Sequence, residues 1–378
     1  MNYQKKEWQS LSTVAEISSF VPADGIPEYH AIIRLTDTKH TTAEQFNRIE
    51  ASIKLLQEYL QDSVLVWKRF FLSDAINQHA YIKHSEEKTA VSIVQQPPLN
   101  ETKVAVWLYF TAGVRLTKNA QETIMSHSSY IHLYHTQLHS SDGNETVQTE
   151  RLFKHYIQML AAKECTLEKH CRRTWVYMQN VDTHYAGMVA ARKKCFEQEG
   201  LTSDTHYIAS TGIEGKYISP DVLVFMDAYA VYGLKPEQTQ YLYAPTHLNP
   251  THQYGVTFER GTAIDYGDRR HIFISGTASI NNRGEIEYPM NIKKQADRMF
   301  ENIVTLLAEA ESGMNDVVHL IVYLRNVDDY ETAVSYLECN YPQIPHIIVL
   351  APVCRPGWLI EAECMAIKEI EDKRFEVY

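Results

Sequence analysis

The chain has 378 residues, a net charge of −11, a hydrophobic content of 44% and a charged content of 22%. This length suffices for two or three units with a substantial core, no apolar run approaches the roughly 18 residues of a membrane span, and the acidic balance argues against a phosphate-binding surface. Because the N-terminal sequence MNYQKKEWQS lacks the apolar stretch of a secretory signal, we expect a cytoplasmic protein that contacts neither membrane nor nucleic acid.

The first helix-and-strand pattern occupies the N-terminal third of the chain. A helical stripe of apolar residues is followed by the strand-like run SVLVWKRFFLSD and by two more, AVSIVQQPP and KVAVWLYF. The stripe consists of Phe46, Ile49, Ile53, Leu56 and Leu60. This copy is the faintest of three, and two repeats behind an unrelated N-terminal domain are the alternative.

The second and third patterns repeat one another. The segments VQTERLFKHYIQMLAAKE and RRTWVYMQNVDTHY reappear as KKQADRMFENIVTLLAEAE and VHLIVYLRNVDDY. Identical residues recur in the same order: Gln148, Arg151, Phe153, Tyr177, Asn180, Val181 and Asp182 as Gln295, Arg298, Phe300, Tyr323, Asn326, Val327 and Asp328. The strand-like runs HYIAST and VLVFMDAYAV follow the second pattern, and HIIVLAPV and WLIEAECMAI follow the third.

The repeat predicts an α/β (α+β) fold of three tandem βαβ units. The polar stretches RLTKNAQET and APTHLNPTHQ place the unit boundaries near residues 120 and 245. We therefore expect units at 1–120, 121–245 and 246–378.

One acidic residue distinguishes the third unit. Aligning the last strands of the units sets Glu361 against Phe225 in the second unit and approximately Val106 in the first. A lone glutamate in an apolar strand is costly unless it has partners or a raised pKa, and such carboxyls cluster at functional sites. Glu361 is therefore the leading catalytic candidate, with a solvent-facing residue at a strand edge as the alternative. Glu363, on the same face, has the acidic counterpart Asp227, which suggests a structural or shared role.

No metal or cofactor is expected. Six cysteines show no CxxC pair, so buried free thiols are expected, and no Gly-rich phosphate loop, GxSxG or HExxH motif occurs. The histidines at 127, 132, 135 and 139 have no standard ligand spacing, and we expect them in a solvated strand and loop.

The last 125 residues resemble the YjgF/RidA superfamily. The motifs QYGVTFERG, IFISGTASI, the helix with Gln295, VYLRNVDDY and WLIEAECMAI occur in the family's order. That family, of chorismate mutase-like fold, forms homotrimers with sites in the clefts between subunits. Three covalent copies then imply a monomer with internal pseudo-threefold symmetry, a pseudo-trimer.

A further resemblance, over about residues 172–367, is to the chorismatase branch. It rests on WVYMQNVDTHYAGMVAARKKCFEQEG, ASTGI, YGVTFERG, SGTAS and VCRPGWLIE. The resemblance implies a cofactor-independent enzyme that hydrolyses chorismate, or a related enolpyruvyl compound, with loss of pyruvate. Glu361 falls on the family's general acid. Cys354 falls where some members carry a cysteine associated with formation of 3-hydroxybenzoate, although a cysteine also often merely packs.

A small carboxylate substrate requires forked cationic donors, and Arg260 and Arg355 lie inside the matching motifs FERG and VCRP. The alternative for each arginine is a surface ion pair. Gly276, Thr277, Ala278 and Ser279 are expected to bring backbone close to the ligand at a strand end, as is Gly212 in ASTGI.

Two other functions remain open. The imine-hydrolysing RidA branch carries a substrate-binding arginine after a proline, where this chain has Pro345 and His346, and a tyrosine where it has Phe258. An enamine or imine deaminase would keep only Glu361 of these three markers. The second alternative is a non-catalytic protein that binds small metabolites in the same cleft.

Overall fold

The computed structural model describes residues 1–82, 88–119 and 121–378, which form three six-stranded mixed sheets of one topology. Numbered within its own sheet, each strand order is 1-2-3-6-4-5, with a parallel pair between the fourth and fifth strands and antiparallel pairs elsewhere. The three copies confirm the predicted fold of tandem YjgF-type units in a pseudo-trimer, the N-terminal copy included.

Each sheet is built from consecutive strands, with helices after its third and fourth strands. The first unit comprises β1 (Asn2–Trp8), β2 (Thr13–Phe20), β3 (Glu28–Leu35), α1 (Thr42–Tyr59), β4 (Ser63–Leu72), α2 (Ala75–Gln78), β5 (Ala90–Gln95) and β6 (Val104–Ala112). The second comprises β7 (Arg115–Asn119), β8 (Glu122–His127), β9 (Tyr130–His139), α3 (Glu145–Ala161), α4 (Leu167–His170), β10 (Cys171–Met178), α5 (Val181–Gln198), β11 (Ala209–Glu214) and β12 (Val224–Tyr232). The third comprises β13 (Thr239–Leu242), β14 (Gly261–Asp265), β15 (Arg269–Ala278), α6 (Ile292–Glu309), β16 (Val317–Leu324), α7 (Tyr330–Asn340), β17 (His346–Leu350) and β18 (Ile360–Glu369). The exact boundaries between units stay a prediction.

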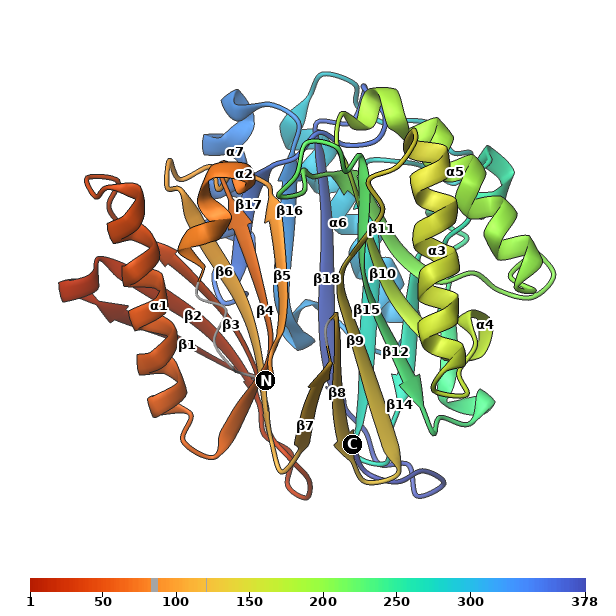
Figure 1. The fold of residues 1–378 in the computed structure, drawn as a ribbon, viewed down its shortest axis with the longest axis horizontal. Coiled ribbons are helices and arrows are strands. Elements are labelled where there is room, and N and C mark those ends of the chain that lie inside the picture. The colour runs from red at the N-terminus through yellow and green to blue at the C-terminus, as the bar shows by residue number, and fades with distance from the viewer. Residues whose placement is uncertain (83–87, 120) are drawn as a thin grey trace.

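The long helices cover the outer faces of the sheets. Thr41 and Glu44 form a capping box at the start of α1, and the Asn144 and Asn291 side chains cap α3 and α6. The apolar stripe of each helix is buried against its own sheet, and Figure 1 shows α1 and α3 on opposite sides of the molecule with the sheets between them. The inner faces of the sheets are therefore left to pack against one another.

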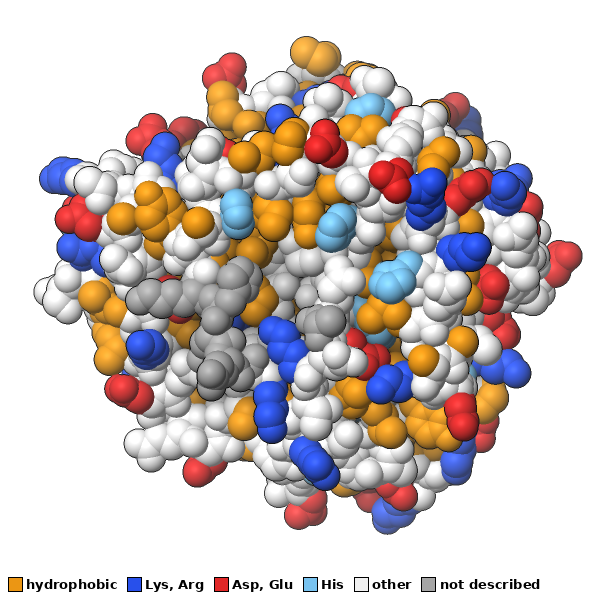
Figure 2. All heavy atoms as spheres, in the orientation of Figure 1, with side chains coloured by type: hydrophobic (Ala, Val, Ile, Leu, Met, Phe, Trp, Pro, Cys, Tyr) orange, Lys and Arg blue, Asp and Glu red, His pale blue; other side chains and the backbone are white. Residues whose placement is uncertain are grey.

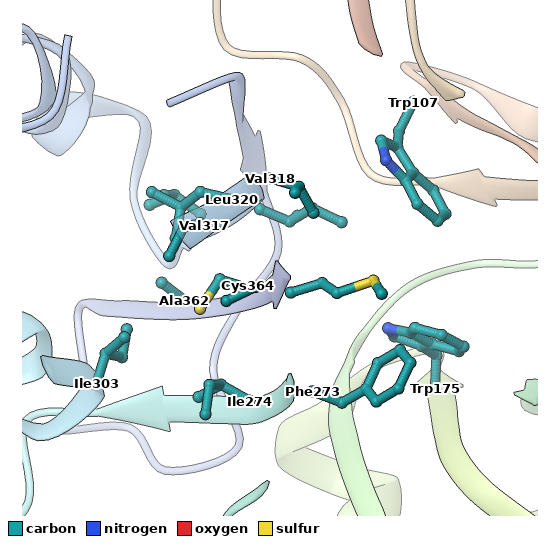
Figure 3. Close-up of a cluster of buried hydrophobic side chains, with 14 of the residues drawn as sticks. Trp107, Trp175, Phe273, Ile274, Ile303, Val317, Val318, Leu320, Ala362 and Cys364 are labelled. Atoms are coloured by element: carbon teal, nitrogen blue, oxygen red, sulfur yellow. The ribbon is translucent and has the colours of Figure 1, made fainter. Parts of the chain in front are cut away.

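The inner faces meet around a core of aromatic rings. The ring centroids of Trp67 and Trp107, both in the first unit, lie 6.0 Å apart. The centroid of Trp67 lies 5.4 Å from that of Trp175 in the second unit. In Figure 3, Trp107 and Trp175 approach the third unit on the side of Phe273, whereas Ile274, the next residue, lies with Ile303 of α6. This alternation follows the two-residue period of a strand, so β15 serves both the outer helix layer and the shared core.

The surface carries charges of both signs, spread over the face in Figure 2. No helix in residues 1–82, 88–119 and 121–378 is long and apolar enough to cross a membrane. One expectation about the histidines is wrong: His132 and His135 on β9 are 1% and 0% exposed, because this strand lies inside the second sheet, between β8 and β12. His135 Nε2 lies 3.3 Å from a Glu122 carboxylate oxygen.

Candidate functional site

A cavity between the second and third units contains Glu361. It has about 510 Å³ of space between atoms, its mouth included. The lining residues come from α5 and β11 of the second unit and from strands and loops of the third: Tyr185, Arg192, Ser210, Gly212, Phe258, Arg260, Gly276, Ala278, Ile280, Cys354, Arg355, Trp358 and Glu361. The cavity thus lies at an interface between two units of the same chain.

Glu361 is the second residue of β18, opposite Ala278 on β15 and Tyr323 on β16. Its residue surface is 5% exposed. Burial and the neighbouring Glu363 carboxylate together raise the pKa of Glu361 to about 8, against a lowering influence from Arg260 and Arg173. The carboxyl is therefore mostly protonated near neutrality and can donate a proton.

A β-bulge makes room for this carboxyl. The register between β15 and β18 shifts between Ile274 and Thr277, so Gly276 lies in the irregular stretch. A Cβ atom at Gly276 would lie 2.2 Å from Glu361 Oε1. A side chain at residue 276 would therefore displace the carboxyl from its position.

The sheet registers identify the counterparts of Glu361. Phe225 is the second residue of β12 and pairs with Tyr177, as Glu361 pairs with Tyr323, which agrees with the sequence alignment. In the first unit the equivalent position, paired with Phe71, is Ala105. The approximate assignment to Val106 was off by one residue, because β6 begins at Val104. Of the three positions, only Glu361 is acidic.

Three arginines surround the cavity, two of them predicted. Arg260, 4% exposed, donates from Nη2 to the Asn249 carbonyl and side-chain oxygens at 3.2 Å. Arg355 donates to the Gly284 carbonyl at 3.1 Å, and its guanidinium lies 4.9 Å from the Trp358 ring. Arg192 on α5, 2% exposed and 3.5 Å from Ser210 Oγ, was missed. It lies inside the motif that carries the chorismatase resemblance, but the sequence did not show that α5 faces the third unit.

Cys354 also lines the cavity. Burial, followed by the neighbouring Glu361 carboxylate, raises the pKa of the Cys354 thiol to about 12, although a hydrogen bond with Tyr185 acts the other way. The thiol is therefore neutral at physiological pH. It can contact a ligand as a small, weakly hydrogen-bonding group but is not a thiolate nucleophile.

The structure brings together most, but not all, of the predicted site residues. Phe258, Gly212, Gly276 and Ala278 line the same cavity as Glu361, whereas Thr277 and Ser279 do not. Thr277 Oγ1 donates to the Ser275 carbonyl, and Ser279 Oγ to the Glu287 carbonyl. Successive residues of a strand point to opposite faces, so Thr277 and Ser279 point away from the cavity that Gly276 and Ala278 line.

His346 is not brought to Glu361 either. It is the first residue of β17 and lines a different cavity, between the third and first units. In the parallel pairs, His346 lies opposite Leu320 as Ser210 lies opposite Thr174, and both partners stand four residues before the end of their strands. The residue at the equivalent strand position of the second unit, Ser210, therefore lines the cavity with Glu361.

Glu363 lies behind the site in an ion-pair network that joins all three units. Its carboxylate accepts from Arg173 Nη2 at 2.8 Å and from the Trp175 indole at 2.7 Å, and it lies 3.7 Å from Arg69 of the first unit. These partners hold Glu363 in place while its negative charge acts on Glu361. The predicted structural or shared role of Glu363 agrees with these contacts.

The remaining donor groups do not gather into a metal centre. Residues 1–82, 88–119 and 121–378 contain no group of three His, Cys, Asp or Glu side chains that could hold an ion. The arrangement of the site supplies a protonated carboxyl, three cationic side chains and a neutral thiol.

The third unit matches a known family. The endoribonuclease L-PSP family matches residues 262–368, and a RutC family protein of Pyrococcus abyssi is 35% identical over 101 residues, which are 26% of this chain and 79% of that protein. The chain therefore belongs to the RutC family, within the YjgF/RidA superfamily.

A solved structure matches the tandem arrangement itself. A chorismatase crystal structure superposes with a TM-score of 0.63 over 80% of this chain and 92% of that chain, at 16% sequence identity. The match spans far more than one unit, so the pseudo-trimer architecture is chorismatase-like.

Proposed function

We propose that the protein is a cofactor-independent hydrolase or lyase that releases pyruvate from chorismate or a related enolpyruvyl carboxylate, with Glu361 as general acid. The observation that carries the proposal is a buried carboxyl with a raised pKa in a cavity lined by Arg192, Arg260 and Arg355. The likeness of the whole fold to a chorismatase structure supports the same substrate class.

The proposed chemistry begins with a proton transfer to carbon. Glu361 donates its proton to the methylene carbon of the enolpyruvyl group, whose double-bond electrons form the new C–H bond and leave an oxocarbenium ion. Water adds to that cation and loses a proton, for which the Glu361 carboxylate is the nearest acceptor. The hemiketal then collapses, which breaks the ether C–O bond and yields pyruvate and the ring alcohol.

The raised pKa matches this role. A carboxyl of ordinary pKa is almost fully ionised at pH 7, whereas Glu361, with a pKa of about 8, is mostly protonated. Above pH 8 the acid form is lost, so kcat is expected to fall on the alkaline side.

The arginines match the charge of the substrate. Chorismate carries two carboxylates, and a guanidinium fork binds a carboxylate through two parallel hydrogen bonds. An enamine substrate of the RidA type carries one carboxylate, so three arginines favour the dianion. Cys354 is proposed to contact the ring and to bias the product toward 3-hydroxybenzoate, which forms when the ring alcohol loses one molecule of water from the adjacent ring position.

The decisive experiment measures the release of pyruvate from chorismate in an assay coupled to lactate dehydrogenase. It compares the wild type with Glu361→Gln and with a matched control, Glu197→Gln, which lies on the exposed side of α5. We expect a loss of roughly 10³-fold in kcat for Glu361→Gln and no loss for Glu197→Gln.

Failure of the wild-type protein to release pyruvate faster than Glu361→Gln would refute the proposal. Parallel incubation with 2-aminoacrylate separates the alternatives. Turnover of the enamine without turnover of chorismate would assign the RidA reaction instead, and turnover of neither would favour a binding protein.

A further inference from the structure

A second cavity lies where the third unit meets the first. It is lined by Tyr3, Lys5, Glu16, Arg34, Pro98, Asn100, Ala105, Tyr330, Val334, Glu338, Pro342, His346, Ile347 and Ile348, and encloses about 980 Å³ between atoms, open mouth included. The two units are joined beside it, since Leu99 donates its backbone N–H to the Ile348 carbonyl at 3.1 Å and Leu350 donates to the Pro97 carbonyl at 2.8 Å. Backbone hydrogen bonds between the two units therefore fix one side of this cleft.

This cleft is the pseudo-symmetric counterpart of the Glu361 cavity. Ala105 occupies the position of Glu361, and His346 occupies that of Ser210. The repeat that aligns Asn180 with Asn326 places Glu338 of α7 where α5 carries Arg192. The cleft has therefore lost the acid and reversed the charge of one cation, so it is not a second copy of the same site.

The polar groups of the cleft carry both signs. The Arg34 guanidinium forms a 2.5 Å ion pair with Glu16, whose other carboxylate oxygen accepts from the His346 backbone N–H at 3.4 Å. Arg34 Nε is buried and has no hydrogen-bond partner among residues 1–82, 88–119 and 121–378. Lys5 and Glu338 stand exposed at the edge, where Lys5 Nζ also lies 3.1 Å from a Glu7 carboxylate oxygen, so cations and carboxylates both line the cleft.

The rest of the lining is apolar or aromatic. Ile347 and Ile348 of β17 and Val334 of α7 provide aliphatic surface beside the charged groups. Tyr3 and Tyr330 also line the cleft, and burial raises the pKa of both phenols, whereas the Arg34 charge lowers it. A ligand in this cleft would meet charge of both signs on one side and an apolar surface on another.

We propose that this cleft binds a small zwitterion of the α-amino acid class with an apolar side chain. The Arg34 and Lys5 cations receive the carboxylate, and the Glu16 and Glu338 carboxylates receive the ammonium group. A dianion such as the proposed substrate of the Glu361 cavity is disfavoured here, because it would meet two carboxylates. The site is independent of the proposed reaction, since none of its residues lines the Glu361 cavity.

The test uses isothermal titration calorimetry on the full-length protein with L-methionine, whose flexible thioether adapts to an irregular apolar surface. 4-(Methylthio)butanoate lacks the ammonium group, and 3-(methylthio)propylamine lacks the carboxylate. We expect L-methionine to bind at least about tenfold more tightly than either analogue. No binding of L-methionine at 10 mM, or equal binding of one analogue, would overturn the proposal.

Two variants locate the binding. Val334→Trp is expected to place an indole over the aliphatic surface of the cleft and abolish binding. Glu338→Gln is expected to weaken L-methionine about tenfold while leaving 4-(methylthio)butanoate unaffected. Both positions are only partly buried or exposed, so the variants should fold, which circular dichroism checks. Glu361→Gln should bind L-methionine as the wild type does. Binding that survives Val334→Trp, or that is lost in Glu361→Gln, would place the ligand elsewhere and contradict the proposal.

Discussion

Glu361 and Phe225 occupy equivalent backbone positions in the third and second units, but their surroundings differ. Both residues stand second on the closing strand of their unit, opposite Tyr323 and Tyr177. Phe225 is completely buried, and its ring lies 4.8 Å from Tyr177 and 5.2 Å from Tyr217. Aromatic packing therefore occupies the position that the third unit leaves open around a carboxyl.

The difference extends to the residues around each position. The spacing from Ser210 to Phe225 equals that from His346 to Glu361, which makes Val353 the counterpart of Tyr217. The glycine at 276 leaves space next to Glu361, because a Cβ atom there would lie 2.2 Å from Glu361 Oε1. The site in the third unit thus depends on the carboxyl and also on the small residue beside it. Burying the carboxyl lowers the stability of the fold, whereas burying the Phe225 ring at the equivalent position does not.

The largest expected effect concerns the pH dependence of stability. Because the folded pKa of Glu361 is about 8, well above its ordinary value near 4.5, its contribution to stability is full below pH 4.5 and is lost as pH rises to 8. Relative to Glu361→Gln, the wild-type free energy of unfolding should fall by about 4 kcal/mol between pH 5 and pH 9. Urea denaturation at both pH values measures this, and parallel curves for the two proteins would show that the carboxyl is not perturbed.

Removing the Phe225 ring from the core of the second unit should have the next largest effect. Phe225→Ala leaves a cavity among fully buried aromatic rings and should lower the free energy of unfolding by about 3 kcal/mol, with no added pH dependence. Urea denaturation of Phe225→Ala beside Phe225→Leu, which keeps most of the volume, tests the packing. A loss below about 1 kcal/mol would mean that the aromatic rings around Phe225 are not tightly packed.

Much of the fold could be predicted because its signals are local. The 3.6-residue stripes of α1 and α6 and the β-branched run of β16 identify their elements without knowledge of partners. Glu361 was also visible, since a carboxyl in an apolar strand is anomalous in any arrangement. The burial of His132 was not, because it depends on the place of β9 inside its sheet.

The partners of Glu361 depended on which units face each other. His346 follows Pro345 where the family has an arginine, but the β17 that carries it faces the first unit, and Ser210 of the second unit faces Glu361 instead. Arg192 was missed for the same reason. The assignment of Thr277 and Ser279 to the site could have been avoided from the sequence. If Gly276 faces the ligand, the two-residue period of a strand places Thr277 and Ser279 on the opposite face.

The space beside Glu361 is tested by a pair of glycine substitutions. In Gly276→Ala the new Cβ would lie 2.2 Å from Glu361 Oε1, so the carboxyl must move, and kcat for pyruvate release should fall about 10²-fold. In Gly212→Ala the nearest atom to the new Cβ, Met178 Cε, is 3.6 Å away, so the loss should stay within about threefold. Steady-state kinetics of both variants decides, and equal losses would contradict a specific role for Gly276.

The smallest expected effect separates substrate binding from chemistry. Arg192 lies on α5 of the second unit and reaches the cavity that holds Glu361 of the third, so Arg192→Met should remove one carboxylate contact. Because that contact is made in both the bound substrate and the transition state, KM should rise about tenfold, equivalent to about 1.4 kcal/mol, with kcat nearly unchanged. Arg374→Met, which alters an exposed ion pair with Asp372, should leave both constants as they are.

Arg192→Lys should recover only part of the loss, since an ammonium group cannot reproduce the two parallel hydrogen bonds of a guanidinium. A fall in kcat without a rise in KM would instead assign Arg192 to stabilisation of the transition state, and the second unit would then take part in the chemistry as well as in binding.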